Sequence, residues 1–316
     1  MLMRARDVSL LDGFIYWFIQ VDCFGSVALK DRKNALFLTI LAGVLWGTSF
    51  PAIKIGLTFV DPYMFVFLRM SIASALVLLI SSLTKNLDLS LAKERIVWYL
   101  GLLNGVAYLI QYLGMSFTTA SKSSLLVNLS AVWVAVLSWL VLKERFSKKK
   151  TLGIASGLIG VFFVSTNLNL LELTQGMITG DGLVFLSGIL WSFFIVYNKK
   201  IVDAHNAIQI MPWIFLATTL PLTPFILLSN NSSLLNLPTE AWTAILYTAI
   251  FCWLIPYYLW VKALKHISPA TSTVILLTEV IVAIAISFFF LGETFTMISG
   301  IGASLIFLAI ILVSIK

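Results

Sequence analysis

One stretch of this chain recurs far downstream in a recognisable second copy. Leu41–Lys54 reads LAGVLWGTSFPAIK, and Leu186–Lys199 reads LSGILWSFFIVYNK. Alignment of the two copies gives five identical pairs: Leu41/Leu186, Gly43/Gly188, Leu45/Leu190, Trp46/Trp191 and Lys54/Lys199. Both copies lie in apolar segments long enough to cross a bilayer. Self-similarity at a fixed offset in such segments is typical of a membrane protein built by internal duplication.

The composition agrees with this interpretation. Hydrophobic residues make up 60% of the chain and charged residues 11%, whereas roughly a quarter of the residues of a soluble domain are charged. Ten apolar runs, each near the roughly 20 residues that span a bilayer, occur at 35–57, 62–83, 96–116, 121–142, 151–168, 181–199, 207–229, 241–263, 268–290 and 296–315. The runs are continuous rather than alternating, which favours helices over the strands of outer-membrane barrels. The sequence therefore predicts an all-α membrane protein with ten transmembrane helices.

The first 34 residues fit this pattern least, and we interpret them as an N-terminal extension. Arg4 and Arg6 precede an apolar run, as in a signal peptide, but aspartates interrupt the run and no clear small-residue cleavage site follows. The alternatives are a short aromatic-rich helix on the membrane surface and a start site assigned too far upstream. Cys23 and Cys252 offer neither a disulfide framework nor a metal-binding spacing, so we interpret both as packing residues.

The basic residues indicate the orientation of the helices. With ten helices, nearly all of them fall on one side of the membrane: Lys30, Arg32, Lys33, Lys85, Lys93, Arg95, Lys143, Arg145, Lys148, Lys149, Lys150, Lys199, Lys200, Lys262, Lys265 and Lys316. The positive-inside rule identifies that side as the cytoplasm, so both termini are predicted to lie inside, at the plasma membrane. The net charge of +7 then follows from topology, and no nucleic-acid partner is expected.

A second pair of stretches tests the duplication. LKERFSKKKTLGIASGLIG from Leu142 corresponds to LGETFTMISGIGASLIF from Leu291, with Glu144 on Glu293. The first copy carries five basic residues and the second carries none. Because each repeat has an odd number of helices, the copies must enter the membrane in opposite senses, and we predict inverted repeats. The predicted units are the N-terminal extension (1–34), a first repeat (35–168), a linker (169–180) and a second repeat (181–316).

These features together resemble a known family. The first helix contains GVLWGTSFPAIK, the second begins near Pro62 with Arg69 within it, and each repeat has a glutamate after its fourth helix, in LKE and LGE. Ten helices in two repeats, with these motifs in this order, resemble the EamA-type transporters of the drug/metabolite transporter superfamily. The resemblance covers about residues 35–316. Family members often carry a proline early in helices 4 and 9, where this chain has Ala131 and Val280, so no helix break is carried over to these positions.

The resemblance implies a secondary transporter, commonly an exporter of amino acids or other small metabolites. We expect two bundles that rock about a midplane site, no cofactor, and a small-molecule substrate, the lipid bilayer and a coupling proton as partners. A membrane enzyme would need a buried catalytic set, yet both histidines lie in predicted loops. No nucleotide-binding loop is recognisable, which argues against ATP-driven pumping. A channel, and a non-transporting scaffold or lipid-handling protein, remain as alternatives.

Two ionisable residues within the apolar spans are candidates for function. Glu279 lies near the middle of the ninth run, and Arg69 lies about 12 Å from the start of the second. A charge at the centre of a membrane helix costs roughly 2.5–3.5 kcal/mol on insertion scales. We predict that Glu279 binds a substrate ammonium group or a coupling proton, and that Arg69 pairs with it or binds a carboxylate. The alternative is a structural role, as an ion pair between helices or an arginine whose long stem reaches the interface.

A second set of polar and aromatic residues is predicted to line a central aqueous pocket. The members come from several runs at helical spacing and are Asn104, Tyr108, Gln111, Asn128, Tyr257, Tyr258, Trp46 and Trp191. The alternative is that each makes an interhelical hydrogen bond or packs helices together. Pro51 and Pro256 each remove a backbone donor and are predicted hinge points.

Overall fold

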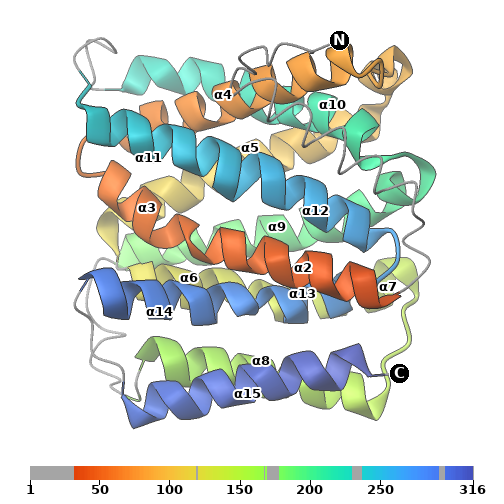
Figure 1. Cartoon of the computed structure of the whole chain (residues 1–316), viewed down its shortest axis with the longest axis vertical. Coiled ribbons are helices and arrows are strands. Elements are labelled where there is room, and N and C mark those ends of the chain that lie inside the picture. Colours follow the sequence, from red (N-terminus) through yellow and green to blue (C-terminus); the bar gives the residue numbers. More distant parts are fainter. Residues whose placement is uncertain are drawn as a thin grey trace, which may run out of the picture.

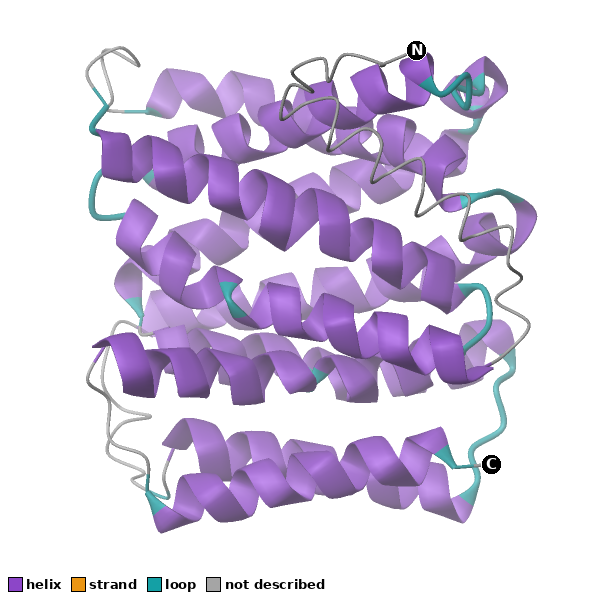
Figure 2. Cartoon of the chain, viewed as in Figure 1, coloured by secondary structure: helices purple, strands orange, loops and turns teal. Residues whose placement is uncertain are grey.

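A computed structural model describes residues 32–118, 120–166, 168, 178–229, 237–291 and 296–315. Within these ranges all regular secondary structure is helical (Figure 2). Most of the predicted N-terminal extension and of the linker, together with Cys23, Lys30, Glu293 and Lys316, lies outside the described residues. Residues 32–34 of the extension form the first turn of a helix.

The first repeat contains α2 (Arg32–Gly47), α3 (Ser49–Gly56), α4 (Pro62–Leu83), the short η1 (Leu89–Lys93), α5 (Arg95–Phe117), α6 (Ala120–Asn128), α7 (Ser130–Leu142) and α8 (Lys148–Thr166). The second contains α9 (Ile178–Ala204), α10 (Ala207–Thr219), η3 (Leu220–Leu228), α11 (Thr239–Ala249), η5 (Ile250–Leu254), α12 (Ile255–Leu264), α13 (Pro269–Leu276), α14 (Thr278–Leu291) and α15 (Met297–Ser314). In the part of the chain that the structure describes, nine helical spans are long and apolar enough to cross a membrane. The run predicted at 151–168 corresponds to α8, which begins with three lysines. The predicted all-α membrane architecture is confirmed.

The two repeats are interleaved. Figure 1 shows counterparts at matching levels along the long axis: α4 with α10, α5 with α11 and α12, α2 and α3 with α9, α6 and α7 with α13 and α14, and α8 with α15. Helix α2 packs on α12, α13 and α14, whereas α9 packs on α5, α6 and α7. The first helix of each repeat therefore contacts the third and fourth helices of the other repeat, which is the reciprocal contact expected of a duplicated unit.

The matched lysines of the two repeats make the same kind of contact. Lys54 Nζ donates to the carbonyls of Met115 and Thr118, at 2.7 and 2.8 Å, at the end of α5. Lys199 Nζ donates to the carbonyls of Leu264 and Lys265, at 2.7 and 3.2 Å, at the end of α12. The last carbonyls of a helix lack intrahelical partners, and a lysine supplies donors there. Each repeat therefore uses its first helix to cap the end of its third.

The fourth helix of each repeat is broken at mid-length. No break was predicted there, because Ala131 and Val280 stand where members of the family often have a proline. Leu129 separates α6 from α7, and Leu277 separates α13 from α14. The break positions are bridged by bonds to a carbonyl three residues earlier, from Val132 N to Leu129 O and from Val280 N to Leu277 O. Such tightened turns interrupt a helix without a proline and often mark functional hinges.

Matched glycines bring the first helices close to these breaks. A Cβ built on Gly43 would lie 3.3 Å from Thr278 Cβ, and one built on Gly188 would lie 3.1 Å from the carbonyl oxygen of Val127. Gly47 approaches more closely still, since its Cβ would lie 2.6 Å from the carbonyl oxygen of Glu279. The recurrence of Gly43 and Gly188 in the sequence thus has a packing reason.

The first span is also broken, at Thr48 between α2 and α3, and this break lies beside an irregular segment of the eighth span. There, η5 is a π-helical stretch between α11 and α12. The hydroxyl of Tyr247 donates to Thr48 Oγ1 at 2.7 Å, and Thr48 Oγ1 lies 3.4 Å from Cys252 Sγ. The predicted hinges at Pro51 and Pro256 each lie a few residues after one of these irregularities.

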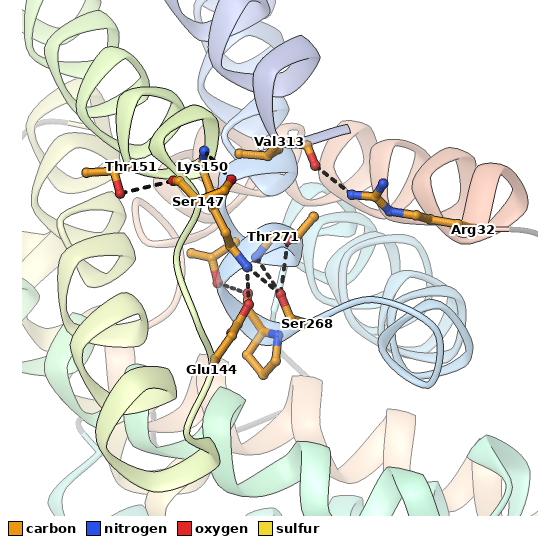
Figure 3. Close-up of polar contacts among 10 residues, drawn as sticks. Arg32, Glu144, Ser147, Lys150, Thr151, Ser268, Thr271 and Val313 are labelled. Atoms are coloured by element: carbon orange, nitrogen blue, oxygen red, sulfur yellow. Dashed lines mark hydrogen bonds and ion pairs between the residues drawn. The ribbon is translucent and has the colours of Figure 1, made fainter. Parts of the chain in front are cut away.

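A polar cluster joins the repeats where α8 begins, at the end of the molecule from which α2 starts (Figure 3). Lys150 Nζ forms an ion pair with Glu144 and donates to Ser268 Oγ at 2.7 Å. Ser268 is the N-cap of α13 in the second repeat. Nearby, Arg32 Nη2 donates to the carbonyl of Val313 at 2.8 Å. The glutamate of the LKE motif therefore helps tie the first repeat to the start of the ninth span.

Candidate functional site

A cavity of about 90 Å³ is lined by residues of both repeats. This is well above the roughly 15 Å³ that a cavity needs to hold one water molecule. Nine of the ten residues predicted as site residues line it: Trp46, Arg69, Asn104, Tyr108, Gln111, Asn128, Trp191, Tyr257 and Glu279. They come from both repeats, on α2, α4, α5, α6, α9, α12 and α14. The structure therefore brings together residues that are widely separated in the sequence.

Glu279 lies where the two broken helices meet. It belongs to the first turn of α14, just after the break at Leu277. One of its oxygens accepts a hydrogen bond of 2.9 Å from Asn128 Nδ2, and Asn128 is the last residue of α6, just before the break at Leu129. A helix N-terminus favours a negative charge. The two breaks thus position a carboxylate and its amide partner at the cavity wall.

Arg69 has its own set of partners and forms no ion pair with Glu279. Its side chain is 1% exposed. Nε donates to the carbonyl of Thr248 at 3.2 Å, Nη2 donates to the carbonyl of Cys252 at 2.9 Å, and Nη1 donates to the hydroxyl of Tyr112. The predicted direct pairing with Glu279 is absent from this conformation, in which the guanidinium donates to Thr248, Cys252 and Tyr112 instead.

The irregular eighth span explains why Arg69 finds these carbonyls. Pro256 has no N–H, so it cannot bond to Cys252, four residues earlier. In the π-helical stretch that precedes it, hydrogen bonds run from i+5 rather than i+4, which leaves further carbonyls without their usual donors. The guanidinium supplies donors to two of them and thereby ties α4 of the first repeat to the eighth span of the second.

The remaining lining residues form an aromatic wall with a few polar groups. The ring of Tyr108 packs edge-on against Trp191 and Trp253, with centroids 4.9 and 5.0 Å apart, and the Arg69 guanidinium lies 5.1 Å from the Tyr108 centroid. Trp46 packs edge-on against Trp260 at 6.0 Å. Such offset contacts are the favoured arrangement of aromatic rings. The wall is therefore rigid and largely apolar.

Two of the predicted polar residues are held by hydrogen bonds. Asn104 Nδ2 donates to Thr218 Oγ1 at 3.1 Å, and the hydroxyl of Tyr257 accepts from Asn198 Nδ2 at 3.1 Å. By contrast, Gln111 Oε1 has no hydrogen-bond partner in the described part of the chain. The same holds for the indole nitrogens of Trp46, Trp191 and Trp253. The cavity thus combines fixed polar groups with several whose hydrogen-bonding capacity is unused.

The chain can now be compared with known proteins. A sequence model of the EamA-like transporter family matches it twice, at residues 33–166 and 178–315. The chain belongs to this family. A solved crystal structure that covers 89% of this chain and 96% of its own has a TM-score of 0.73 at 17% identity, which supports the fold alone.

Two relatives of this EamA-family protein carry names that describe transport. A protein of Archaeoglobus fulgidus named an uncharacterized transporter is 29% identical over 86% of this chain and 94% of its own length. A protein of Salmonella typhimurium named a probable amino-acid metabolite efflux pump is 25% identical over 87% of this chain and 93% of its own length. The family and these relatives are transporters, and the protein is an integral membrane protein.

Tyr258 is the one predicted site residue that does not line the cavity. Its hydroxyl accepts a hydrogen bond of 3.2 Å from Lys262 Nζ, whose charge also lies 5.1 Å from the Tyr258 ring centroid. Consecutive helical residues do not share a face. Tyr257 and Tyr258 could not both point into the cavity from one helix.

Sequence reasoning missed the tryptophans of the eighth span. Trp253 and Trp260 line the cavity together with Tyr257. Their spacing of four and three residues defines one helical face, and this pattern was available in the sequence. Because tryptophans in an apolar span usually pack against other helices or lipid, residue type alone did not distinguish them.

Proposed function

We propose that this protein is a secondary transporter that exports small metabolites, amino acids or related compounds first among them, by alternating access. The single observation that carries the proposal is the cavity, which is enclosed by both inverted repeats and combines a carboxylate with an aromatic wall. Carriers of inverted-repeat architecture bind substrate near the bilayer midplane, at the interface of the repeats. The name of the Salmonella relative supports amino-acid metabolites as cargo and efflux as direction.

The irregular helices are the elements that would move. The breaks at Thr48, Leu129 and Leu277 and the π-helical segment surround the cavity residues, and short irregular turns absorb the backbone rotation of a hinge. The cluster of Lys150, Glu144 and Ser268 would hold one end closed. We assign this end to the cytoplasmic side of the plasma membrane, with both termini inside, because of the basic residues around it.

Glu279 is the proposed coupling and binding group. It is the one carboxylate among the described residues that line the cavity, and the other ionisable residues there are Arg69, Tyr108 and Tyr257. Arginine and tyrosine ordinarily titrate far above neutral pH. A proton bound at Glu279 in one conformation and released in the other would link cargo movement to a proton gradient.

Flux through purified protein in proteoliposomes tests the proposal. Radiolabelled amino acids, assayed one at a time in counterflow with the unlabelled compound, are expected to give saturable exchange that responds to an imposed pH gradient. The Glu279→Gln variant is expected to lose the response to pH, whereas Glu94→Gln, the same change at an exposed loop position, should keep it. An unchanged rate and pH response in Glu279→Gln would remove the coupling role, and flux that does not saturate would indicate a channel.

A further inference from the structure

We infer that the cavity recognises the ammonium group of its cargo and disfavours a carboxylate. The cargo class is then a primary amine with an apolar body. This inference rests on the proposed transport function and moves the first cargo class from amino acids to related primary amines, which share the ammonium group of an amino acid. It follows from the balance of charged and hydrogen-bonding groups around the cavity.

The negative charge in the cavity is available to a ligand. Glu279 is partly exposed, and the one hydrogen bond it accepts comes from the neutral side chain of Asn128. Among the described residues, no ion pair is shown for its carboxylate. An uncompensated carboxylate at membrane depth is costly, and an ammonium group on the cargo would offset that cost.

The positive charge near the cavity is buried and held in place by protein oxygens. Arg69 is the one cation among the described lining residues, and each of its three nitrogens donates to a protein oxygen. Lys54, in the first span, donates to two carbonyls at the end of α5. Because the Arg69 side chain is buried, a cargo carboxylate would have to displace the protein oxygens that Arg69 contacts in order to pair with it. The same carboxylate would enter beside the partly exposed Glu279, and like charges in a low dielectric repel strongly.

The remaining groups suit an ammonium on an apolar body. An ammonium has three donors and no acceptor, and besides Glu279 the cavity offers Gln111 Oε1, which is without a partner in the described part of the chain. Cations also bind to the faces of aromatic rings. The wall supplies rings for this purpose and for the apolar body of the cargo: Trp46, Tyr108, Trp191, Trp253, Tyr257 and Trp260.

The unused indole donors do not change this balance. The nitrogens of Trp46, Trp191 and Trp253 are neutral donors, so they can donate to a hydroxyl or carbonyl oxygen of the cargo but cannot cancel the charge of a carboxylate. An amino-acid ester or amide, or an amine with a hydroxyl group, is thus compatible with the site.

Three compounds that share a phenylethyl body test the inference in purified full-length protein. Phenylethylamine carries only the ammonium, phenylalanine carries ammonium and carboxylate, and 3-phenylpropionate carries only the carboxylate. In isothermal titration, phenylethylamine is expected to bind at least as tightly as phenylalanine and at least about tenfold more tightly than 3-phenylpropionate. Glu279→Gln should weaken phenylethylamine binding by about tenfold or more, while Glu94→Gln should leave it unchanged.

The opposite ranking overturns the inference. Phenylalanine binding about tenfold more tightly than phenylethylamine, binding of 3-phenylpropionate equal to that of the amine, or binding of none of the three would each contradict it. So would full phenylethylamine affinity in a Glu279→Gln protein. Flux of the same compounds in proteoliposomes separates the two proposals, because amine binding without flux would support ammonium recognition and contradict transport.

Discussion

Arg69 illustrates at the scale of a single residue what the sequence can and cannot reveal. A charged residue inside an apolar run is a recognisable signal, because its presence in lipid is costly unless it has partners. The partners themselves are the carbonyls of Thr248 and Cys252, which lie next to and within an irregular segment of another span. No local pattern around Arg69 encodes them. The charge could be predicted to matter, but the choice between cargo binding and helix anchoring could not.

The anchoring role makes a prediction about stability. Arg69→Gln would remove the guanidinium hydrogen bonds to the carbonyls of Thr248 and Cys252, and a hydrogen bond to a charged group contributes about 1.5–3 kcal/mol. We expect a clearly lower unfolding temperature in detergent, whereas phenylethylamine affinity in the folded fraction should change by less than about threefold. Arg95→Gln, at an exposed position, is the matched control. Loss of amine binding at unchanged stability would instead assign Arg69 to the cargo.

At the scale of the elements, the spans could be predicted and their interruptions could not. The apolar runs at 62–83 and 96–116 became α4 (Pro62–Leu83) and α5 (Arg95–Phe117), because apolar length is set by the bilayer. The breaks at Leu129 and Leu277 have a leucine at the interruption and depend on packing between repeats. Pro51 and Pro256 did mark the neighbourhood of irregular segments, since a proline removes a donor wherever it lies in a helix.

Close packing of the first and ninth spans makes a prediction at this scale. In Gly47→Ala, the new Cβ would lie 2.6 Å from the carbonyl oxygen of Glu279, so the backbone beside the carboxylate must move. We expect a lower unfolding temperature and weaker phenylethylamine binding. Gly182→Ala is the control, because a Cβ there meets nothing within 4 Å in α9 and alanine favours a helix over glycine by about 1 kcal/mol. Equal behaviour of the two variants would contradict the packing argument.

At the scale of the whole molecule, the recurrence of one sequence stretch predicted the architecture and much of the cavity. Lys54 and Lys199 cap corresponding helices, and Trp46 and Trp191 line one cavity. Tyr108 and Tyr257, in the third helix of each repeat, also line it. What the sequence could not supply was the interleaving of the repeats, because the register of one helix against another depends on side-chain packing rather than on apolar length.

The opposite insertion of the two repeats is the central claim, and labelling of single cysteines tests it most directly. In a protein without Cys23 and Cys252, a cysteine replaces either Thr58, exposed after the first helix of the first repeat, or Ala204, exposed at the end of the first helix of the second. Intact cells are treated with a membrane-impermeant maleimide. The account predicts that the Thr58→Cys protein reacts from outside and that the Ala204→Cys protein reacts only after permeabilisation. Equal reaction of both proteins in intact cells would contradict it.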